Sequence, residues 1–271
     1  MSIQVAELHF STPPKFEFGA VKDRAAAILG EGLDTLSSED SQRSYLIGHP
    51  QHAVTYTEGT VPAQTAILVA DQPIELERYA DKIQQSWGWP DCESALAKSR
   101  HTLSVCEMMA GQLPPADRVR LFHGVLQALV EQTRPDAIVF HHTQQVIHPE
   151  AYLGSVESPP ILRPGSLNVR FFNVADSEDD MLMDVRGLDE LGLHDVQCHF
   201  RGLDPDDVAR LLFNTAVYVF ENGPVIESGN TIAGVGQDAK WQCQFEPSLL
   251  EPDRELLDLN PGPPHAAGNR H

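Results

Sequence analysis

The sequence is short of positive charge. Its 271 residues include 19 Lys and Arg against 39 Asp and Glu, which leaves a formal net charge of −20 at pH 7. Such a charge repels the phosphates of nucleic acids and anionic membranes, so neither is expected as a partner. It would attract a basic protein partner, although keeping the protein in solution would be a sufficient reason for it. Composition therefore narrows the class of partner without identifying a function.

Cysteines and long apolar runs are also scarce. The four cysteines, Cys92, Cys106, Cys198 and Cys243, include no close pair, so their spacing fits neither a zinc site nor a disulfide framework. We expect buried thiols in a reducing cytoplasm. No stretch approaches 18 uninterrupted apolar residues, and residues 1–10 lack the basic start and apolar core of a signal peptide. The sequence thus predicts a soluble, cytoplasmic protein.

The chain does contain an alternation of short strand and helix patterns. Periods of two and of about 3.6 predict strands at 5–10, 52–57, 64–70, 101–109, 137–145, 167–174, 181–185, 196–201 and 241–245, and helices at 21–29, 74–87, 116–132 and 206–219. The last helix has the strongest start signal, with Asp204 as N-cap and Pro205 in the first turn. Hairpin-like turns between strands favour α+β over a doubly wound parallel sheet.

We therefore expect an α+β fold of two ferredoxin-like split β-α-β halves, with mixed or antiparallel sheets and helices packed on one face. Residues 1–150 are expected to form the first half and residues 165–260 the second. A proline-containing linker would join them over about 149–164. The Pro, Gly, His and Ala composition of residues 261–271 predicts a disordered tail.

A histidine-rich segment supplies the first candidate site. His142, His148 and Glu150 are residue types that bind zinc or non-haem iron. However, His141 and His142 are neighbours on a predicted strand and would point to opposite faces, and no helical HExxH spacing is present. Ordinary polar packing is the preferred interpretation, and a metal-assisted hydrolase using these residues is kept as an alternative.

Other catalytic patterns are incomplete. The chain has no GxSxG elbow, and Cys198 and His199 are adjacent on a predicted strand, where their side chains diverge. The acidic run at 176–180 lacks the glycine and the bidentate glutamate of a calcium loop, so it is interpreted as a solvated turn. We predict no catalytic residue, no bound metal and no cofactor.

Two segments remain as binding candidates. The glycine-rich stretch 226–236 has no lysine for a phosphate loop, so we predict a turn with Gly229 and Asn230 at positive φ. Trp87 and Trp89 lie beside a predicted helix end, where burial in the core is the simpler interpretation and an exposed interface the alternative. The candidate binding residues are Trp87, Trp89, Gly229, Asn230 and Thr231.

Several segments together resemble a known family. They are residues 62–67, 135–142, 181–193, 225–232, 241–245, 247–248 and 254–257. The motif VIESGNTI at 225–232 resembles a signature in which an acidic residue precedes Gly-x-Thr. Over about residues 50–258 the sequence is similar to the bacterial domain-of-unknown-function 4261 family.

The resemblance implies an interaction role, because members of that family look like accessory or immunity-type proteins of bacterial toxin and contractile-secretion (type VI) loci. Our leading hypothesis is a non-enzymatic cytoplasmic protein that neutralises or chaperones a protein partner, which the negative charge would favour if that partner is basic. The alternatives are the metal-assisted hydrolase and a structural subunit of a secretion assembly. The partner, the interface and the oligomeric state stay open.

Overall fold

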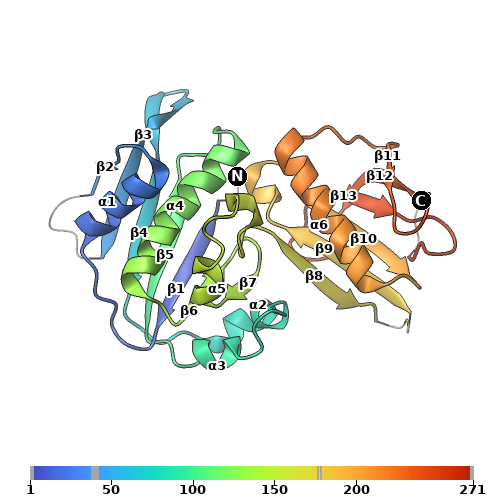
Figure 1. The fold of residues 1–271 in the computed structure, drawn as a ribbon, viewed down its shortest axis with the longest axis horizontal. Coiled ribbons are helices and arrows are strands. Elements are labelled where there is room, and N and C mark those ends of the chain that lie inside the picture. The colour runs from blue at the N-terminus through green and yellow to red at the C-terminus, as the bar shows by residue number, and fades with distance from the viewer. Residues whose placement is uncertain (1–2, 38–42, 176, 178, 269–271) are drawn as a thin grey trace. The chain divides into compact units, whose positions relative to one another are not determined.

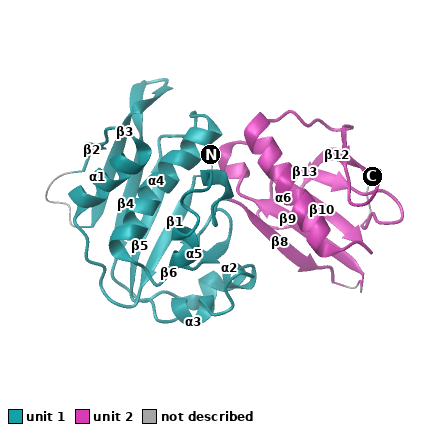
Figure 2. Cartoon of the chain, viewed as in Figure 1, with its two compact units in different colours: residues 1–166 teal, residues 167–271 magenta. Residues whose placement is uncertain are grey.

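The computed structural model describes residues 3–37, 43–175, 177 and 179–268, and it divides into two compact units (Figure 2). Unit 1 is Met1–Ser166 and unit 2 is Leu167–His271. Each unit has its own sheet and is described by itself. The α+β class predicted from the sequence is confirmed. The predicted acidic turn at 176–180 lies partly outside the described residues.

Within its described residues, unit 1 holds a sheet of seven strands in the order β2-β3-β4-β5-β1-β6-β7, with every neighbouring pair antiparallel. The strands are β1 (Val5–Phe10), β2 (Asp34–Thr35), β3 (Ser44–Tyr56), β4 (Gly59–Ala70), β5 (His101–Met108), β6 (Ala137–Phe140) and β7 (Gln145–Ile147). Strand β1 comes first in the chain but lies inside the sheet, between β5 and β6 (Figure 1). Residues near the N-terminus therefore lie beside residues near position 140 in the same sheet.

Helices α1 (Phe18–Leu29) and α4 (Pro115–Thr133) cover one face of this sheet (Figure 1). The core between helices and sheet includes Leu8, Ile67, Val105, Phe122, Leu126 and Ile138. Helix α4 starts with Pro115 in its first turn and ends at Arg134, which has φ 49° and precedes a proline. The predicted helix at 116–132 is confirmed.

The opposite face of the sheet is also covered, so the prediction of helices on one face is wrong for unit 1. The 3-10 helix η1 (Leu76–Tyr79) and the short helices α2 (Ala80–Gln84) and α3 (Cys92–Leu96) contribute to a second core there. Two cores exist because successive residues of β6, such as Ile138 and Val139, point to opposite faces.

The predicted helix at 74–87 is helical over 76–84. Ser86 explains the early end, because its hydroxyl donates to the Lys82 carbonyl and accepts from the Val146 N–H at 2.8 Å. This side chain therefore ties the helix end to β7. The predicted strand at 137–145 is similarly interrupted by a turn after β6.

The segment predicted as a linker, 149–164, belongs to unit 1. It contains α5 (Pro149–Leu153) and the 3-10 helix η2 (Pro160–Leu162). Tyr152 is buried, and its hydroxyl lies 2.9 Å from Nδ1 of His123 on α4. The segment is thus held by the core of unit 1, which extends to residue 166.

In unit 2 the described strands are ordered β11-β12-β13-β10-β9-β8. They are β8 (Asn168–Asn173), β9 (Asp180–Arg186), β10 (Val196–Arg201), β11 (Thr231–Ala233), β12 (Lys240–Pro247) and β13 (Glu255–Asn260). Neighbouring pairs are antiparallel except β10 and β13, which are parallel. Unit 2 has one α-helix among its described elements, whereas a ferredoxin-like βαββαβ half has two. The ferredoxin-like prediction therefore does not hold for unit 2, and for unit 1 it stays a prediction.

Helix α6 (Pro205–Asn222) packs on the sheet of unit 2 (Figure 1). The side chain of Asp204 caps its start as predicted, with Oδ1 accepting from the Asp206 N–H at 2.9 Å. The buried positions have helical spacing and form one apolar face: Val208, Leu212, Thr215, Ala216 and Val219.

The chain after β13 contacts unit 2 where a disordered tail was predicted. The Arg201 N–H donates to the His265 carbonyl at 2.9 Å, and Ala267 is buried. The prediction is therefore wrong for residues 261–268, and residues 269–271 lie outside the described residues. The structure describes all four cysteines as free thiols: Cys92, Cys198 and Cys243 are buried as predicted, whereas Cys106 is half-buried. No helix in the described ranges is long and apolar enough to cross a membrane.

Candidate functional site

The predicted binding residues of unit 2 lie at one turn. The Asn230 N–H donates to the Glu227 carbonyl at 3.0 Å, and the Glu227 N–H donates to Asn230 Oδ1 at 3.1 Å. Gly229 has φ 92°, as predicted, because the third position of such a turn requires positive φ. Asn230 does not have positive φ, which corrects the prediction; its side chain closes the turn through a hydrogen bond instead.

This turn opens onto a groove of about 450 Å³ between α6 and β11. The exposed side chains of the groove are mainly apolar: 49 % of Tyr218 and 51 % of Val225 is accessible to solvent. Other lining residues include Leu211, Ile226, Asn230, Thr231 and Ile232. Two of the three residues predicted at this turn, Asn230 and Thr231, therefore line the groove, and Gly229 shapes the turn beside it.

Strand β11 gives the groove a second property. It is the last strand of its sheet, with β12 as its neighbour on one side and no strand on the other side among the described residues. Thr231 and Ala233 are exposed. An edge strand of this kind can pair with an extended peptide through backbone hydrogen bonds.

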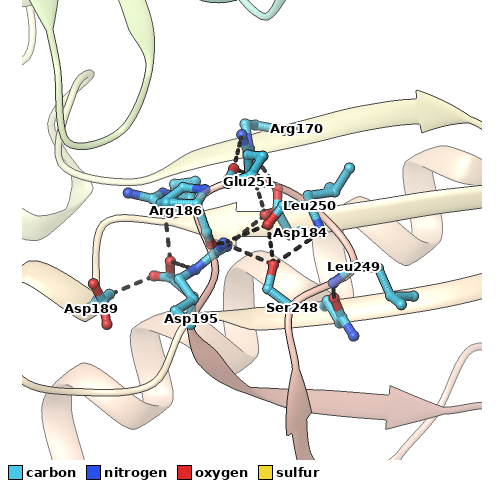
Figure 3. A network of polar contacts seen from close by, with 12 residues as sticks. Arg170, Asp184, Arg186, Asp189, Asp195, Ser248, Leu249, Leu250 and Glu251 are labelled. Carbon is cyan, nitrogen blue, oxygen red and sulfur yellow. Dashed lines mark hydrogen bonds and ion pairs between the residues drawn. The ribbon is translucent and has the colours of Figure 1, made fainter.

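A network of buried charges connects strands β8 and β9 of the same sheet with the segments that lead into it (Figure 3). Asp184 on β9 accepts from Arg170 Nε on β8 at 2.8 Å and from Arg254 Nη2 at 2.7 Å. Arg254 also donates through Nε to Asp195 Oδ2 at 2.8 Å. All four side chains are buried. Charge-assisted bonds therefore connect β8, β9 and the segments that precede β10 and β13.

Asp195 also fixes the connection between β9 and β10. Its Oδ1 accepts from three successive backbone N–H groups, those of Gly187 at 3.1 Å, Leu188 at 2.9 Å and Asp189 at 3.3 Å. Successive N–H groups of this kind form a nest that binds an anion, and here the anion is the Asp195 carboxylate itself. Asp195 therefore stabilises the fold of this connection.

Glu190 forms the outer end of the network. Its Oε1 accepts from Arg186 Nη2 at 2.9 Å, whereas its buried Oε2 has no hydrogen-bond partner among the described residues. Burial raises the pKa of Glu190 to about 7, against the opposing effect of the Arg186 charge. Because these charges are buried, they hold the fold and do not face a ligand.

Comparison with known proteins bears on this part of the chain. Residues 184–260 match a family described as Domain of unknown function (DUF4261). The resemblance seen in the sequence is confirmed for these residues. The DUF4261 match spans α6, the groove and all the network residues named above except Arg170. No curated protein and no solved structure matches the chain.

The three residues of the alternative metal site lie in unit 1, outside the DUF4261 match. His142 is buried edge-on against the rings of Phe122 and Phe140. His148 caps α5, with Nδ1 accepting from the Glu150 N–H at 3.2 Å. In the described part of the chain, no three His, Cys, Asp or Glu side chains are placed to hold a metal ion.

Trp87 and Trp89 have different environments. Trp87 is 61 % exposed, which corrects the interpretation that it is buried, and its Nε1 donates to Gln85 Oε1 at 3.3 Å. Trp89 is half-buried against the second core, and its ring meets that of His148 edge-on at 4.8 Å. Of the two indoles, Trp87 presents the larger surface to solvent.

A polar cluster that sequence reasoning missed lies on the second face of the unit 1 sheet. Oε2 of Glu7 accepts from the Tyr79 hydroxyl at 2.8 Å, and it lies 3.0 Å from His141 Nε2 and 3.3 Å from His9 Nε2. Burial alone would raise the pKa of Glu7, but the contacts from His141, His9 and Tyr79 together hold it well below its usual range.

The sequence held one signal for this cluster. Glu7 and His9 are two apart on a strand pattern, so both point to the same face. Their partners could not be inferred, because Tyr79 and His141 reach them only through the placement of β1 beside β6 and under η1. Such long-range pairing is not encoded in local periodicity.

Proposed function

We propose that the protein binds another protein through the groove of unit 2, and that it takes an extended segment that carries Lys or Arg. The supporting observation is the combination found there: an apolar groove bordered by the edge strand β11. An edge strand offers backbone hydrogen bonds, and an adjacent groove accepts alternate side chains of the added strand.

The charge of unit 2 supports a basic occupant. Residues 167–271 contain seven Lys and Arg against 19 Asp and Glu, which leaves −12. Three of the seven, Arg170, Arg186 and Arg254, are buried with the three carboxylates of Asp184, Glu190 and Asp195, so the network adds no net charge and the −12 comes from residues outside it. This field would accelerate and orient the encounter with a cationic segment more than it would add to final affinity.

The biological role belongs to the same proposal. We infer a non-enzymatic, cytoplasmic protein of the immunity or accessory type, associated with a bacterial toxin or a contractile secretion system. The support is the family resemblance together with the groove. The hydrolase alternative has less support, since His142 packs on Phe122 and Nδ1 of His148 accepts from the Glu150 backbone. The structural subunit of a secretion assembly stays an alternative.

A displayed library of random ten-residue peptides tests the proposal. Selection on the full chain is expected to enrich sequences with Lys or Arg and alternating apolar residues, whose affinity is then measured by fluorescence anisotropy. Tyr218→Ala should weaken binding at least tenfold, because an aromatic anchor in the groove is lost. Leu249→Ala, another exposed apolar residue of unit 2, is the matched control and should change affinity less than twofold.

Ionic strength separates the electrostatic part of the proposal from the apolar part. Raising NaCl from 50 to 300 mM should lower the association rate while Tyr218→Ala mainly raises the dissociation rate. Enriched peptides without basic residues would overturn the basic occupant. Equal binding by Tyr218→Ala and the wild-type protein would overturn the groove.

A further inference from the structure

Unit 1 contains a cavity of about 280 Å³ beside the Glu7 cluster. Its floor is the sheet, where Glu7 and Ser104 are directly paired across β1 and β5 and Thr102 is the next residue of β5 on the same face. Its walls come from the connection between β4 and η1, including Gln72, and from Tyr79. At roughly 30 Å³ per water molecule, the volume equals that of about nine waters, which suits a small ligand.

Glu7 lines this cavity, and its two carboxylate oxygens have different surroundings. The three close neighbours, Tyr79, His141 and His9, all approach Oε2. No hydrogen bond joins Oε1 to the described residues, the side chain is 20 % exposed, and Glu7 is one of the residues that line the cavity. The carboxylate is therefore oriented by Oε2 and open to a ligand at Oε1.

We propose that this cavity binds a small organic cation whose primary ammonium or guanidinium group contacts Oε1 of Glu7. The hydroxyls of Ser104 and Thr102 and the amide of Gln72 lie in the same lining and can accept the remaining N–H groups. The ring of Tyr79 adds a face that attracts cations.

The other charged side chains near the cavity bear on how strongly Glu7 would attract a cation. Arg78 lines the cavity, but its Nε pairs with Glu75 Oε2 at 2.6 Å, so the two charges offset each other. Lys82 lies 5.7 Å from the centre of the Tyr79 ring, and burial lowers its pKa. The nearby carboxylate of Glu7 opposes this lowering, so a bound cation would share the field of Glu7 with Lys82.

An acid–base role for Glu7 fits less well than an anchoring role. A general base works best when its pKa is near the working pH, and the pKa of Glu7 is shifted in the opposite direction. A metal ligand role is also disfavoured by the geometry. Nε2 of His9 and Nε2 of His141 both lie against the carboxylate, and Nδ1 of His9 is 3.1 Å from the Ser99 hydroxyl.

Calorimetric titration of the full chain tests the cavity with three probes of similar size: butylammonium, propylguanidinium and the neutral butanol. The two cations should bind with one site per chain and butanol at least tenfold more weakly. Glu7→Gln should reduce cation affinity at least tenfold. Glu58→Gln removes an equal charge at an exposed turn of the same unit and should stay within twofold of the wild-type protein.

A second variant keeps the test decisive if Glu7→Gln does not fold. Ser104→Leu fills the cavity from the strand opposite Glu7 and leaves the contacts to Oε2 in place, so it should abolish cation binding. Cation binding that persists in Ser104→Leu, or equal binding of butanol, would overturn the proposal. Tyr218→Ala lies in unit 2 and should bind the cations normally, so failure here is distinguishable from failure of the peptide groove.

Discussion

At the scale of single residues, Arg254 links two buried carboxylates of unit 2. It is buried and lies between two buried carboxylates, those of Asp184 and Asp195. A buried ion pair adds little net stability compared with an apolar pair of the same shape. Removing one member is different, because the remaining charges stay buried with fewer partners. Arg254 pairs with two buried carboxylates; after its loss Asp184 would keep Arg170, and Asp195 would keep its backbone N–H donors. Its loss should still be more damaging than that of a surface arginine, because two buried charges lose a partner at once.

This arrangement makes a quantitative prediction. Arg254→Met should lower the free energy of unfolding by about 3–5 kcal/mol, since Asp184 and Asp195 lose their shared partner. Urea unfolding followed by circular dichroism measures the change. Arg210→Met is the control, because Arg210 is exposed and its pair with Asp207 should contribute at most about 1 kcal/mol. A loss below about 1 kcal/mol for Arg254→Met would contradict the network's structural role.

Glu190 predicts a dependence of stability on pH. Its carboxyl has a pKa of about 7 in the fold against 4.5 for the ordinary group, so the native state holds the proton more tightly. The contribution of this proton to the free energy of unfolding is fully present below pH 4.5 and is lost as pH rises through 7. At 1.36 kcal/mol per pH unit, the loss amounts to about 3 kcal/mol between pH 4.5 and 8.

Glu190→Gln tests this dependence, because the neutral amide cannot ionise. Between pH 5 and 8, the free energy of unfolding should change less for the variant than for the wild-type protein. Urea titrations at each pH measure it. Glu221→Gln, which changes an exposed carboxyl on α6 of the same unit, should leave the wild-type slope unchanged. Parallel pH profiles for Glu190→Gln and the wild-type protein would show that Glu190 ionises normally.

At the scale of elements, the sequence predicts most of the long strands and helices but not their pairing. Strands β1 and β10 have the predicted bounds, and α6 starts at its predicted cap. The short strands β2, β7 and β11 were not predicted, because two or three residues carry too little periodicity. The same limit applies to the sites. Asn230 and Thr231 were predicted from a local turn, whereas Glu7 needs partners from η1 and the end of β6.

The hairpin of β11 and β12 explains one glycine of the segment 226–236. A Cβ atom on Gly234 would lie 2.1 Å from the indole of Trp241, which is buried. Gly234→Ala should therefore displace the indole and lower the free energy of unfolding by about 1–3 kcal/mol. Thermal unfolding and the tryptophan emission spectrum measure both effects. Gly32→Ala, with open space at its Cβ position, is the matched control, and equal stability of the two variants would contradict the close approach.

At the scale of the whole molecule, the two units carry different kinds of site. The DUF4261 match lies within unit 2, which holds the groove and the charge network. The cavity beside Glu7 lies in unit 1. The acidic charge is common to both, with −8 over residues 1–166 and −12 over residues 167–271. Charge is therefore a property of the whole chain, and its effect on stability can be measured without reference to either site.

A net charge of −20 predicts that monovalent salt stabilises the fold. Repulsion between like charges on a compact protein acts over about 30 Å at 0.01 M ionic strength and about 8–10 Å at 0.1–0.15 M, so salt should screen most of it. Exposed ion pairs such as Arg24–Glu131 lose some attraction at the same time, but each contributes at most about 1 kcal/mol. Buried pairs such as Arg254–Asp184 are screened little. The melting temperature should therefore rise by several degrees between 10 and 200 mM NaCl. KCl should raise the melting temperature equally, because screening does not depend on the identity of the cation. A rise with one salt alone would indicate specific ion binding. No rise with either salt would contradict the prediction and show that the acidic surface is already locally balanced.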